Sequence, residues 1–164
     1  MRFFILTVAG FAGLEIFSYL VHRWLFHGVL WRVHRTHHLP RKGFFELNDL
    51  FSGAFAAVSV ALLAFAEKPL GESTAFPVGL GIAIYGTIYF LVHDLFTHRR
   101  FAPFNSGNKI LLTIRAAHRR HHQTAEKRGL EPFGLFFFDY ARFWRKITAP
   151  EKQKAEAEKI STSA

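Results

Sequence analysis

The sequence predicts an all-α fold, an integral membrane bundle with three to four transmembrane helices. Half of the 164 residues are apolar and 20 are Phe, a composition too apolar for an ordinary small soluble domain. The apolar residues form long runs, whereas a soluble α/β domain shows short periodic segments. Basic and histidine-rich patches separate these runs, and basic residues flank the spans of membrane proteins in the same way.

Three apolar runs are long enough to cross a hydrocarbon core about 30 Å thick, which takes roughly 17 to 25 helical residues. They are residues 3–21, 50–66 and 76–96. A fourth, re-entrant element fits between residues 24 and 33. We interpret the first run as a span and not as a signal peptide, because no clear A-x-A cleavage site precedes the first histidine.

Lysine and arginine are distributed unevenly about these runs. Residues 22–49 carry five and residues 97–164 carry 14, so 19 of the 21 lie on one side and only Arg2 and Lys68 lie on the other. By the positive-inside rule this side is cytoplasmic, which leaves the N-terminus outside. The net charge of +9 is not accompanied by a nucleic-acid-binding motif, so we expect no nucleic-acid partner.

The part of the chain beyond the third run is expected to hold two more helices. The segment GNKILLTIRAAHRRHHQT predicts a helix that begins near Asn108, and EPFGLFFFDYARFWRK predicts an amphipathic helix at the level of the lipid headgroups. We expect a single membrane-embedded domain over residues 1–148. Residues 149–164 are charged and lack a core-forming pattern, which is typical of a disordered tail.

The ten histidines fall into four clusters, and none lies elsewhere. The clusters are HRWLFH (His22, His27), HRTHH (His34, His37, His38), HDLFTH (His93, His98) and HRRHH (His118, His121, His122). In a helix, positions i, i+3 and i+4 share one face, so each H-x2-H-H group projects three imidazoles in one direction. The members of each H-x4-H pair are about 140° apart on an ideal helix, so both reach one ion only where the helix ends or distorts.

The predicted topology brings the four clusters to the same side of the membrane. Ten imidazoles match two metal ions with four to six ligands each, so we predict a histidine-rich dimetal site on the cytoplasmic face. One structural zinc would use fewer than half of these ligands, and a haem with two axial histidines would leave eight unexplained. Imidazole binds Fe, Zn, Cu and Ni, so the spacing does not select the metal. The absence of Cys excludes thiolate sites and iron–sulfur clusters.

These motifs resemble those of the fatty acid hydroxylase superfamily, and more specifically of the bacterial β-carotene 3-hydroxylases. The segments HRWLFHG, WRVHRTHH, FELND, HDLFTHRR and AAHRRHH carry the resemblance, over residues 17–122. It implies a membrane-bound di-iron monooxygenase that uses O2 to hydroxylate C3 of the β-ionone rings of a carotenoid, with electrons from a ferredoxin or similar donor. It also implies that all ten histidines are metal ligands. The implied metal is iron, which zinc can replace in a purified preparation.

Two other functions stay open on the sequence alone. A hydroxylase or desaturase of another membrane lipid, such as a fatty acyl chain or a sterol, would use the same ligands. A non-catalytic metal-binding membrane protein would keep the ligands but need no electron donor. A basic surface of Arg99, Arg100, Arg119 and Arg120 suits either an acidic ferredoxin or anionic lipid headgroups.

Carboxyl and amide side chains near the clusters are candidates to orient the imidazoles, because a ligating ring usually donates its other N–H to an oxygen acceptor. They are Glu46, Asn48, Asp49 and Asp94, followed by Asp139. The alternatives are helix capping by Glu46 and Asp49, a water bound by Asn48 and solvation of a helix end by Asp94.

Glu15 is unusual because it lies near the middle of a span, where a carboxyl group usually faces the bundle interior. It either lines the route to the metals, pairs with a neighbouring helix or is a neutral structural carboxyl. We expect Glu15→Gln to impair turnover while sparing metal content. In the third span, Gly79, Gly81 and Gly86 indicate either close helix packing or an apolar slot for a rod-like polyene.

Overall fold

The computed structural model describes residues 1–40 and 43–149, and the regular elements in these ranges are all helical, as predicted. The elements are α1 (Arg2–Leu20), the π-helix η1 (Val21–Phe26), α2 (Trp31–His38), α3 (Asp49–Ala64), α4 (Ala75–Tyr89), the π-helix η2 (Phe90–Thr97) and α5 (Lys109–His121). A further helix covers residues 140–149. The predicted tail, 149–164, lies outside the described residues except for residue 149, which ends this helix.

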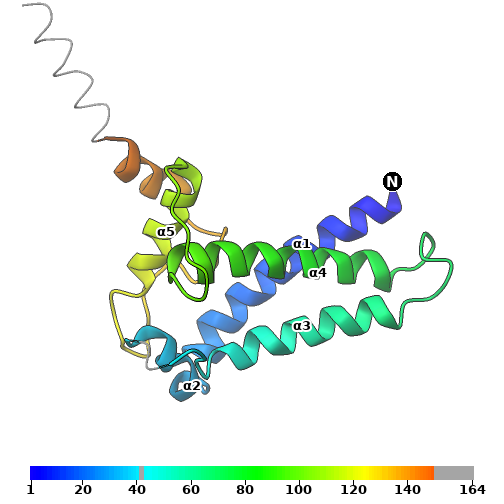
Figure 1. Ribbon diagram of the computed structural model, residues 1–164, viewed down its shortest axis with the longest axis horizontal. Helices are drawn as coiled ribbons and strands as arrows, with labels where there is room; N and C mark the ends of the chain where they lie inside the picture. The colour runs from blue at the N-terminus through cyan, green and yellow to red at the C-terminus, as the bar shows by residue number, and fades with distance from the viewer. Residues whose placement is uncertain (41–42, 150–164) are drawn as a thin grey trace, which may run out of the picture.

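The long helices α1, α3 and α4 form the bundle, and α4 packs against both of the others (Figure 1). The backbones of α1 and α4 touch, because a Cβ atom on Gly10 would overlap the carbonyl oxygen of Val78 and one on Gly81 would overlap that of Thr7. Small residues allow this close approach between membrane helices. On the other side of α4, the hydroxyl of Ser59 in α3 donates a hydrogen bond of 3.0 Å to the carbonyl of Gly79.

The three long helices run lengthwise between two ends of the molecule. The guanidinium of Arg2 donates to the carbonyl of Glu72 (2.8 Å) and to the hydroxyl of Thr74 (2.6 Å), so α1 and α4 begin at the same end. Both therefore run towards the opposite end, which carries the histidines, and α3 runs back (Figure 1).

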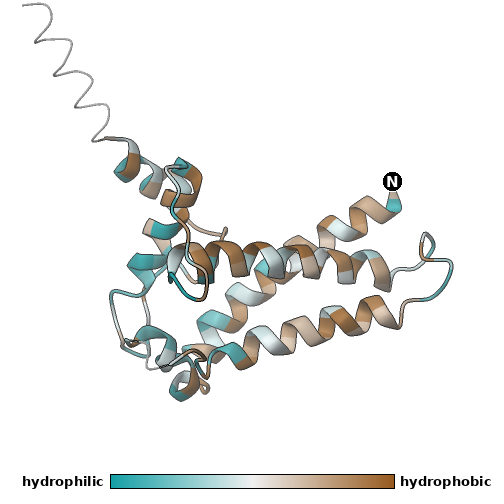
Figure 2. Ribbon diagram, viewed as in Figure 1, coloured by the Kyte–Doolittle hydropathy of each residue, from teal (hydrophilic) through white to brown (hydrophobic). Residues whose placement is uncertain are grey.

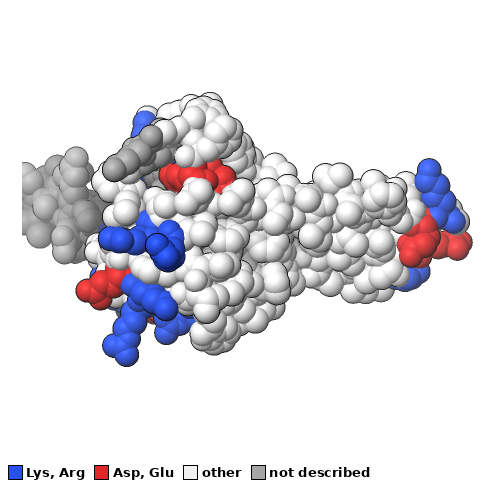
Figure 3. All heavy atoms as spheres, turned by 90° about the horizontal axis from the view of Figure 1, so that it is seen from below, with Lys and Arg blue, Asp and Glu red and all other residues white. Residues whose placement is uncertain are grey.

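The surface of the bundle is apolar. The continuous helices Arg2–Phe26 and Ala75–Thr97 are 25 and 23 residues long, with mean hydropathies of 1.9 and 1.8, which is enough to cross a membrane. Only 17% and 28% of their most apolar windows are buried, so these helices expose apolar side chains and do not resemble the core helices of a soluble domain. Helix α3, with 16 residues, is apolar but shorter. Figure 2 shows the brown bundle beside a teal, histidine-bearing end, and Figure 3 shows charged side chains at the two ends of the face in view.

One helix prediction needs correction and one is confirmed. In the region of the expected re-entrant element, a turn at 27–30 leads into α2, whose eight residues span only about 12 Å. Residues 131–139 are irregular, and the predicted amphipathic helix starts only at residue 140. The helix expected near Asn108 is confirmed, since the side-chain oxygen of Asn108 accepts hydrogen bonds from the backbone N–H groups of Ile110 and Leu111, as an N-cap does.

The 131–139 segment departs from the prediction because its backbone donors have other partners. The N–H groups of Phe136 and Phe137 both donate to Oε1 of Glu15, at 2.8 and 2.7 Å. The backbone near Gly134 passes close to α1, and a Cβ atom there would lie 2.7 Å from the same oxygen. The 131–139 segment is therefore held against α1 by hydrogen bonds, whereas the apolar pattern alone predicted a surface helix there.

Candidate metal centre

The two H-x4-H pairs lie on π-helical turns. The N–H of His27 donates to the carbonyl of His22 at 3.1 Å, and the N–H of His98 donates to that of His93 at 2.9 Å. These i→i+5 hydrogen bonds place the two members of each pair one above the other, so their imidazoles face the same side. The predicted distortion of the helix is therefore confirmed, and it takes the form of a π-helix.

The ten imidazoles meet at one end of the bundle, and nine of them divide into two groups of mutually close nitrogens. The first set is His22, His27, His34, His38 and His121, and the second set is His37, His93, His98 and His118. Within each set the potential ligand nitrogens all lie within 4.8 Å of one another. His122 lies between the sets, with its ring 4.3 Å from that of His38 and 4.6 Å from that of His98.

Helices α2 and α5 contribute to both sets, which explains the H-x2-H-H spacing. In α2, His34 and His38 lie one turn apart and belong to the first set, while His37 belongs to the second. In α5, His121 belongs to the first set and His118 to the second. The three imidazoles of a cluster share a face, as predicted, but each cluster contributes imidazoles to both sets.

Six histidines donate an Nδ1–H group to an oxygen that can only accept. The acceptors are Phe133 O for His22 (2.6 Å), Lys127 O for His27 (2.9 Å), Asn48 Oδ1 for His34 (2.7 Å), Glu46 Oε2 for His37 (2.9 Å), Thr124 O for His38 (2.9 Å) and Leu130 O for His121 (2.6 Å). The proton therefore lies on Nδ1, and Nε2 presents its lone pair to the centre of the site. This is how metal-ligating histidines are oriented in proteins.

The Nε2 atoms face one another at short range. They are 3.0 Å apart for His22 and His34, 3.2 Å for His34 and His38, 3.1 Å for His37 and His93, 3.3 Å for His27 and His121, and 2.8 Å for His98 and His118. Lone pairs that face each other repel unless a cation lies between them. Two ligands at right angles on an ion, each about 2.1 Å from it, are about 3.0 Å apart. The donor atoms therefore fit one metal ion in each set, and the five nitrogens of the first exceed the four of tetrahedral zinc.

The imidazoles outside the spans are uncharged at neutral pH. Burial, with further lowering from neighbouring imidazoles, reduces the pKa of His34 to about 3 and that of His121 to about 2. Burial is also the main cause that lowers the pKa of His27 to about 4. The pKa values of His37 and His118 lie well below the ordinary value for the same reason. The neutral ring is the form that binds metal.

Of the five residues predicted to orient imidazoles, two accept a hydrogen bond from a ring and three do not. Asn48 and Glu46 accept from His34 and His37, as described above. Asp94 approaches Nδ1 of His93 at 3.5 Å, but that nitrogen makes no hydrogen bond among the described residues. Asp49 makes no hydrogen bond to an imidazole among the described residues and accepts the backbone N–H of Glu46 at 2.9 Å. Asp139 accepts the backbone N–H of Arg142 at 3.0 Å, where the last helix begins.

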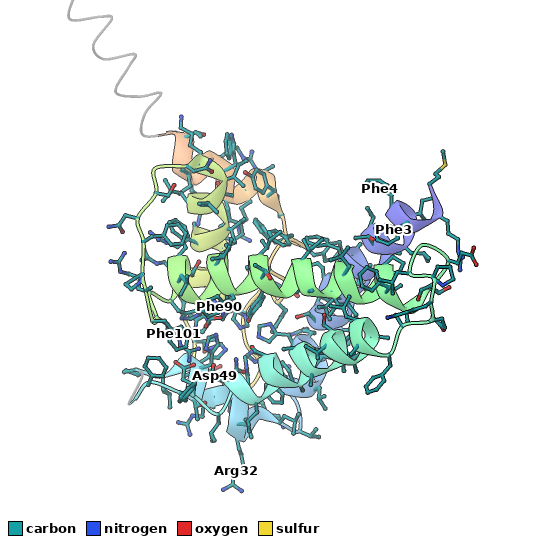
Figure 4. All side chains as sticks on the ribbon, turned by 45° about the vertical axis from the view of Figure 1, so that its right-hand side comes forward. Phe3, Phe4, Arg32, Asp49, Phe90 and Phe101 are labelled. Carbon is teal, nitrogen blue, oxygen red and sulfur yellow. The ribbon has the colours of Figure 1, made fainter. Side chains whose placement is uncertain are left out.

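Arg100 is a buried part of the site, so its predicted place on a basic surface is wrong. Its residue exposure is 3%, and its guanidinium donates to Asp94 (2.8 Å) and to both carboxylate oxygens of Asp49 (2.7 and 2.6 Å). It also lies 3.9 Å from Glu46. Arg100 thus holds together the carboxylates beside the second set. Figure 4 shows Asp49 near Phe90 and Phe101, at the end of the bundle opposite Phe3 and Phe4.

Sequence reasoning also missed the 123–139 loop, which supplies four of the six acceptors for Nδ1. Backbone carbonyls carry no residue signature, so only the glycines of this loop could have indicated its role. Gly129 has a φ of 65°, which favours glycine. A Cβ atom at Gly129 would lie 2.7 Å from Nδ1 of His27, so the loop packs directly on this imidazole.

A small cavity of about 30 Å³ lies among the imidazoles, enough for one or two water-sized molecules. Its walls include His22 and His34 of the first set, His37, His93 and His118 of the second, and Asn48, Tyr89 and Phe133. The ring of Tyr89 stacks on that of His93, with centroids 4.3 Å apart. The space between the two sets is therefore large enough for a diatomic molecule.

The arrangement of ten histidines agrees with a family comparison. A model of the fatty acid hydroxylase family matches residues 7–144. The chain belongs to the fatty acid hydroxylase family. This match begins before and ends after the residues that carried the resemblance in the sequence, and it includes the loop that supports the imidazoles.

The chain is also similar to proteins that are named beta-carotene hydroxylases. A beta-carotene hydroxylase of Pseudescherichia vulneris is 42% identical over 143 residues, which cover 84% of this chain and 74% of the relative. A beta-carotene hydroxylase of Pantoea ananas is 38% identical over 130 residues, with 76% and 71% covered. The chloroplastic beta-carotene 3-hydroxylase 2 of Arabidopsis thaliana is 40% identical over 136 residues, covering 81% of this chain but only 44% of the plant protein. No solved structure matches the chain.

Proposed function

We propose that this chain hydroxylates the β-ionone rings of carotenoids at C3, converting β-carotene to β-cryptoxanthin and then to zeaxanthin. The observation that carries the proposal is the convergence of ten imidazoles, as two sets and a bridging ring, in a chain that is similar to carotenoid hydroxylases over most of its length. At each ring, one oxygen atom of O2 enters a C–H bond and the other leaves as water. This reaction consumes two electrons and two protons.

The two sets of imidazoles would hold two iron ions. Bound iron supplies the electrons and the binding position for the reduction of O2, which side chains alone cannot provide. The protein contributes the remaining requirements. The oxygen acceptors on six Nδ1 atoms fix the direction of the opposite lone pairs, and burial keeps the rings neutral.

The two-electron supply requires a redox partner, for which we propose a ferredoxin or a similar one-electron donor. The exposed arginines Arg99 and Arg119 lie at the histidine end of the molecule, where they suit an acidic protein or anionic headgroups.

We further propose that α1, α3 and α4 all cross the membrane, with this end in the cytoplasm and the N-terminus outside. The lysine and arginine distribution supports this orientation. A reporter enzyme fused after Ala164 should be active in the cytoplasm only.

The reaction is tested by expressing the chain in cells that make β-carotene, under ¹⁸O-labelled O2. We expect products that are heavier by one and by two labelled oxygen atoms. The His38→Ala variant, which removes one ligand of the first set, should produce neither. Unmodified β-carotene in the presence of iron-loaded protein would refute the proposal and favour another lipid substrate or a metal-binding role.

A further inference from the structure

We propose that the large cavity between α1, α3 and α4 is the slot that receives the ring end of the carotenoid from the bilayer, and that Gly53 and Gly86 set its width. This inference rests on the proposed function and adds the location of the substrate site. The cavity has a volume of about 620 Å³, within the usual range of ligand pockets.

The shape of the cavity suits a long and narrow molecule. Along α3 its walls extend from Asn48 to Leu63, and along α4 and η2 from Ile82 to Asp94. These fifteen and twelve helical steps correspond to about 22 and 18 Å of helix axis. Figure 1 shows α3 and α4 diverging towards the histidine end, so the slot widens in the direction of the metal centre.

The lining of the cavity is apolar along most of its length. Leu14, Phe55, Ala56, Val60 and Ile82 contribute to its walls. Val60 and Phe90 are 63% and 43% exposed, so the cavity opens onto the apolar surface of the bundle. A hydrocarbon can therefore enter from the bilayer without passing through water.

The inner end of the cavity reaches the metal centre. Ser18, Phe26, Asn48 and Tyr89 line both this cavity and the small cavity among the imidazoles. Asn48 also orients His34 of the first set through its 2.7 Å hydrogen bond. A ring that fills the inner end of the slot would thus lie against the residues that separate it from both sets of nitrogens.

The glycines of α4 show which of its faces is packed and which is open. A Cβ atom on Gly79 would lie 2.8 Å from the Cβ of Leu62 in α3, and one on Gly81 would overlap the backbone of α1. A Cβ atom on Gly86 would meet nothing within 4 Å, and the same holds for Gly53 on α3. Of the two explanations given for the glycine series, close packing thus applies to Gly79 and Gly81, and Gly86 faces the slot.

The open space at Gly86 and Gly53 permits a direct test, because a large side chain there fills the slot without displacing another helix. Gly13 on α1 is the matched control, since a Cβ atom there also meets nothing within 4 Å and the residue does not line the cavity. We would compare Gly86→Phe, Gly53→Phe and Gly13→Phe with the wild type. Three readouts are needed: iron per chain, β-carotene bound per chain in lipid nanodiscs, and hydroxylated carotenoid formed in cells.

We expect all three variants to keep the iron content of the wild type. Gly86→Phe and Gly53→Phe should lose at least about tenfold in β-carotene binding and turnover, since a single methylene in an apolar pocket already changes discrimination by about 10- to 200-fold. Gly13→Phe should remain close to the wild type. Gly86→Ala, which adds one methyl group, should retain most activity and shows whether the loss follows side-chain size.

The outcomes separate the slot from the reaction. If Gly86→Phe and Gly53→Phe bind and hydroxylate β-carotene as Gly13→Phe does, the slot is refuted while the proposed function stands. If the wild type leaves β-carotene unmodified, the proposed function fails, and a loss of binding in Gly86→Phe alone would still support the slot. If the wild type binds only phospholipid, and Gly86→Phe removes it, an acyl chain occupies the cavity and the inference is overturned.

Discussion

Glu15 provides the sharpest test of how the 123–139 loop supports the metal centre. It is 7% exposed and accepts three hydrogen bonds, from the backbone N–H groups of Phe136 (2.8 Å) and Phe137 (2.7 Å) and from the hydroxyl of Tyr85 (2.6 Å). Of the roles considered from the sequence, the contact with Tyr85 supports pairing with a neighbouring helix. The same carboxyl fixes a loop whose Phe133 carbonyl orients His22.

The variants Glu15→Ala and Glu15→Gln separate the loss of the acceptor from the loss of charge. In Glu15→Ala all three donors lose their partner, and each unsatisfied buried donor costs about 1 to 3 kcal/mol. The total of about 3 to 9 kcal/mol is comparable with the whole stability of a domain, about 5 to 15 kcal/mol. Glu15→Gln keeps an acceptor oxygen for the two N–H groups, and the hydroxyl of Tyr85 can turn to meet the amide.

We therefore expect Glu15→Gln to retain the loop, the iron and most turnover, which revises the expectation from the sequence. Glu15→Ala should release the loop, accelerate hydrogen exchange at the amides of residues 136 and 137, and lower the iron content. Exchange measured by mass spectrometry in nanodiscs, together with iron analysis, tests both variants. If Glu15→Ala exchanges at the wild-type rate and keeps its iron, the proposed role of Glu15 is wrong.

Three further predictions follow from the site. Arg100→Gln should sharply reduce the iron content, because breaking a buried ion pair costs about 3 to 5 kcal/mol. The control Arg99→Gln, at an exposed arginine, should keep the iron content of the wild type. Equal iron content in the two variants would contradict the role of Arg100. Gly129→Ala should lower the unfolding temperature, because a left-handed residue other than glycine costs about 1 to 2 kcal/mol and the new Cβ atom crowds His27. Gly107→Ala, at a position with open space, is its control. Metal-free protein should lose stability as the pH falls below 6.5 towards 4. Over this range histidines of the unfolded chain bind protons, whereas buried imidazoles such as His27, with a pKa of about 4, stay neutral in the folded chain. An unfolding temperature that does not change over this range would contradict the burial of neutral rings.

The sequence predicted that the histidines would lie together, because metal binding imposes spacing. The H-x4-H pairs required a distorted helix, and the π-helices η1 and η2 provide it. The cap at Asn108 fixed the start of α5 because its signal is local. The convergence of the four clusters followed from counting the apolar spans between them.

The rest depended on tertiary contacts that the sequence does not encode locally. Arg100 follows another arginine at the end of a span, so it resembled an interfacial residue until the carboxylates around it were known. The loop after His122 supports the imidazoles through backbone carbonyls, which every residue has. Gly79 and Gly86 are seven residues apart on one helix, and only the divergence of α3 from α4 distinguishes packing from an open slot.

The number of irons bound by each chain tests the central claim most directly. We predict that anaerobic titration of metal-free protein with ferrous iron saturates at two equivalents, one for each set of imidazoles. His34 and His37 lie on the same helix but belong to different sets. The variants His34→Ala and His37→Ala should therefore each weaken the binding of a different iron equivalent. Saturation of the wild type at one equivalent, or at none, would contradict the claim that the imidazoles form a dimetal centre.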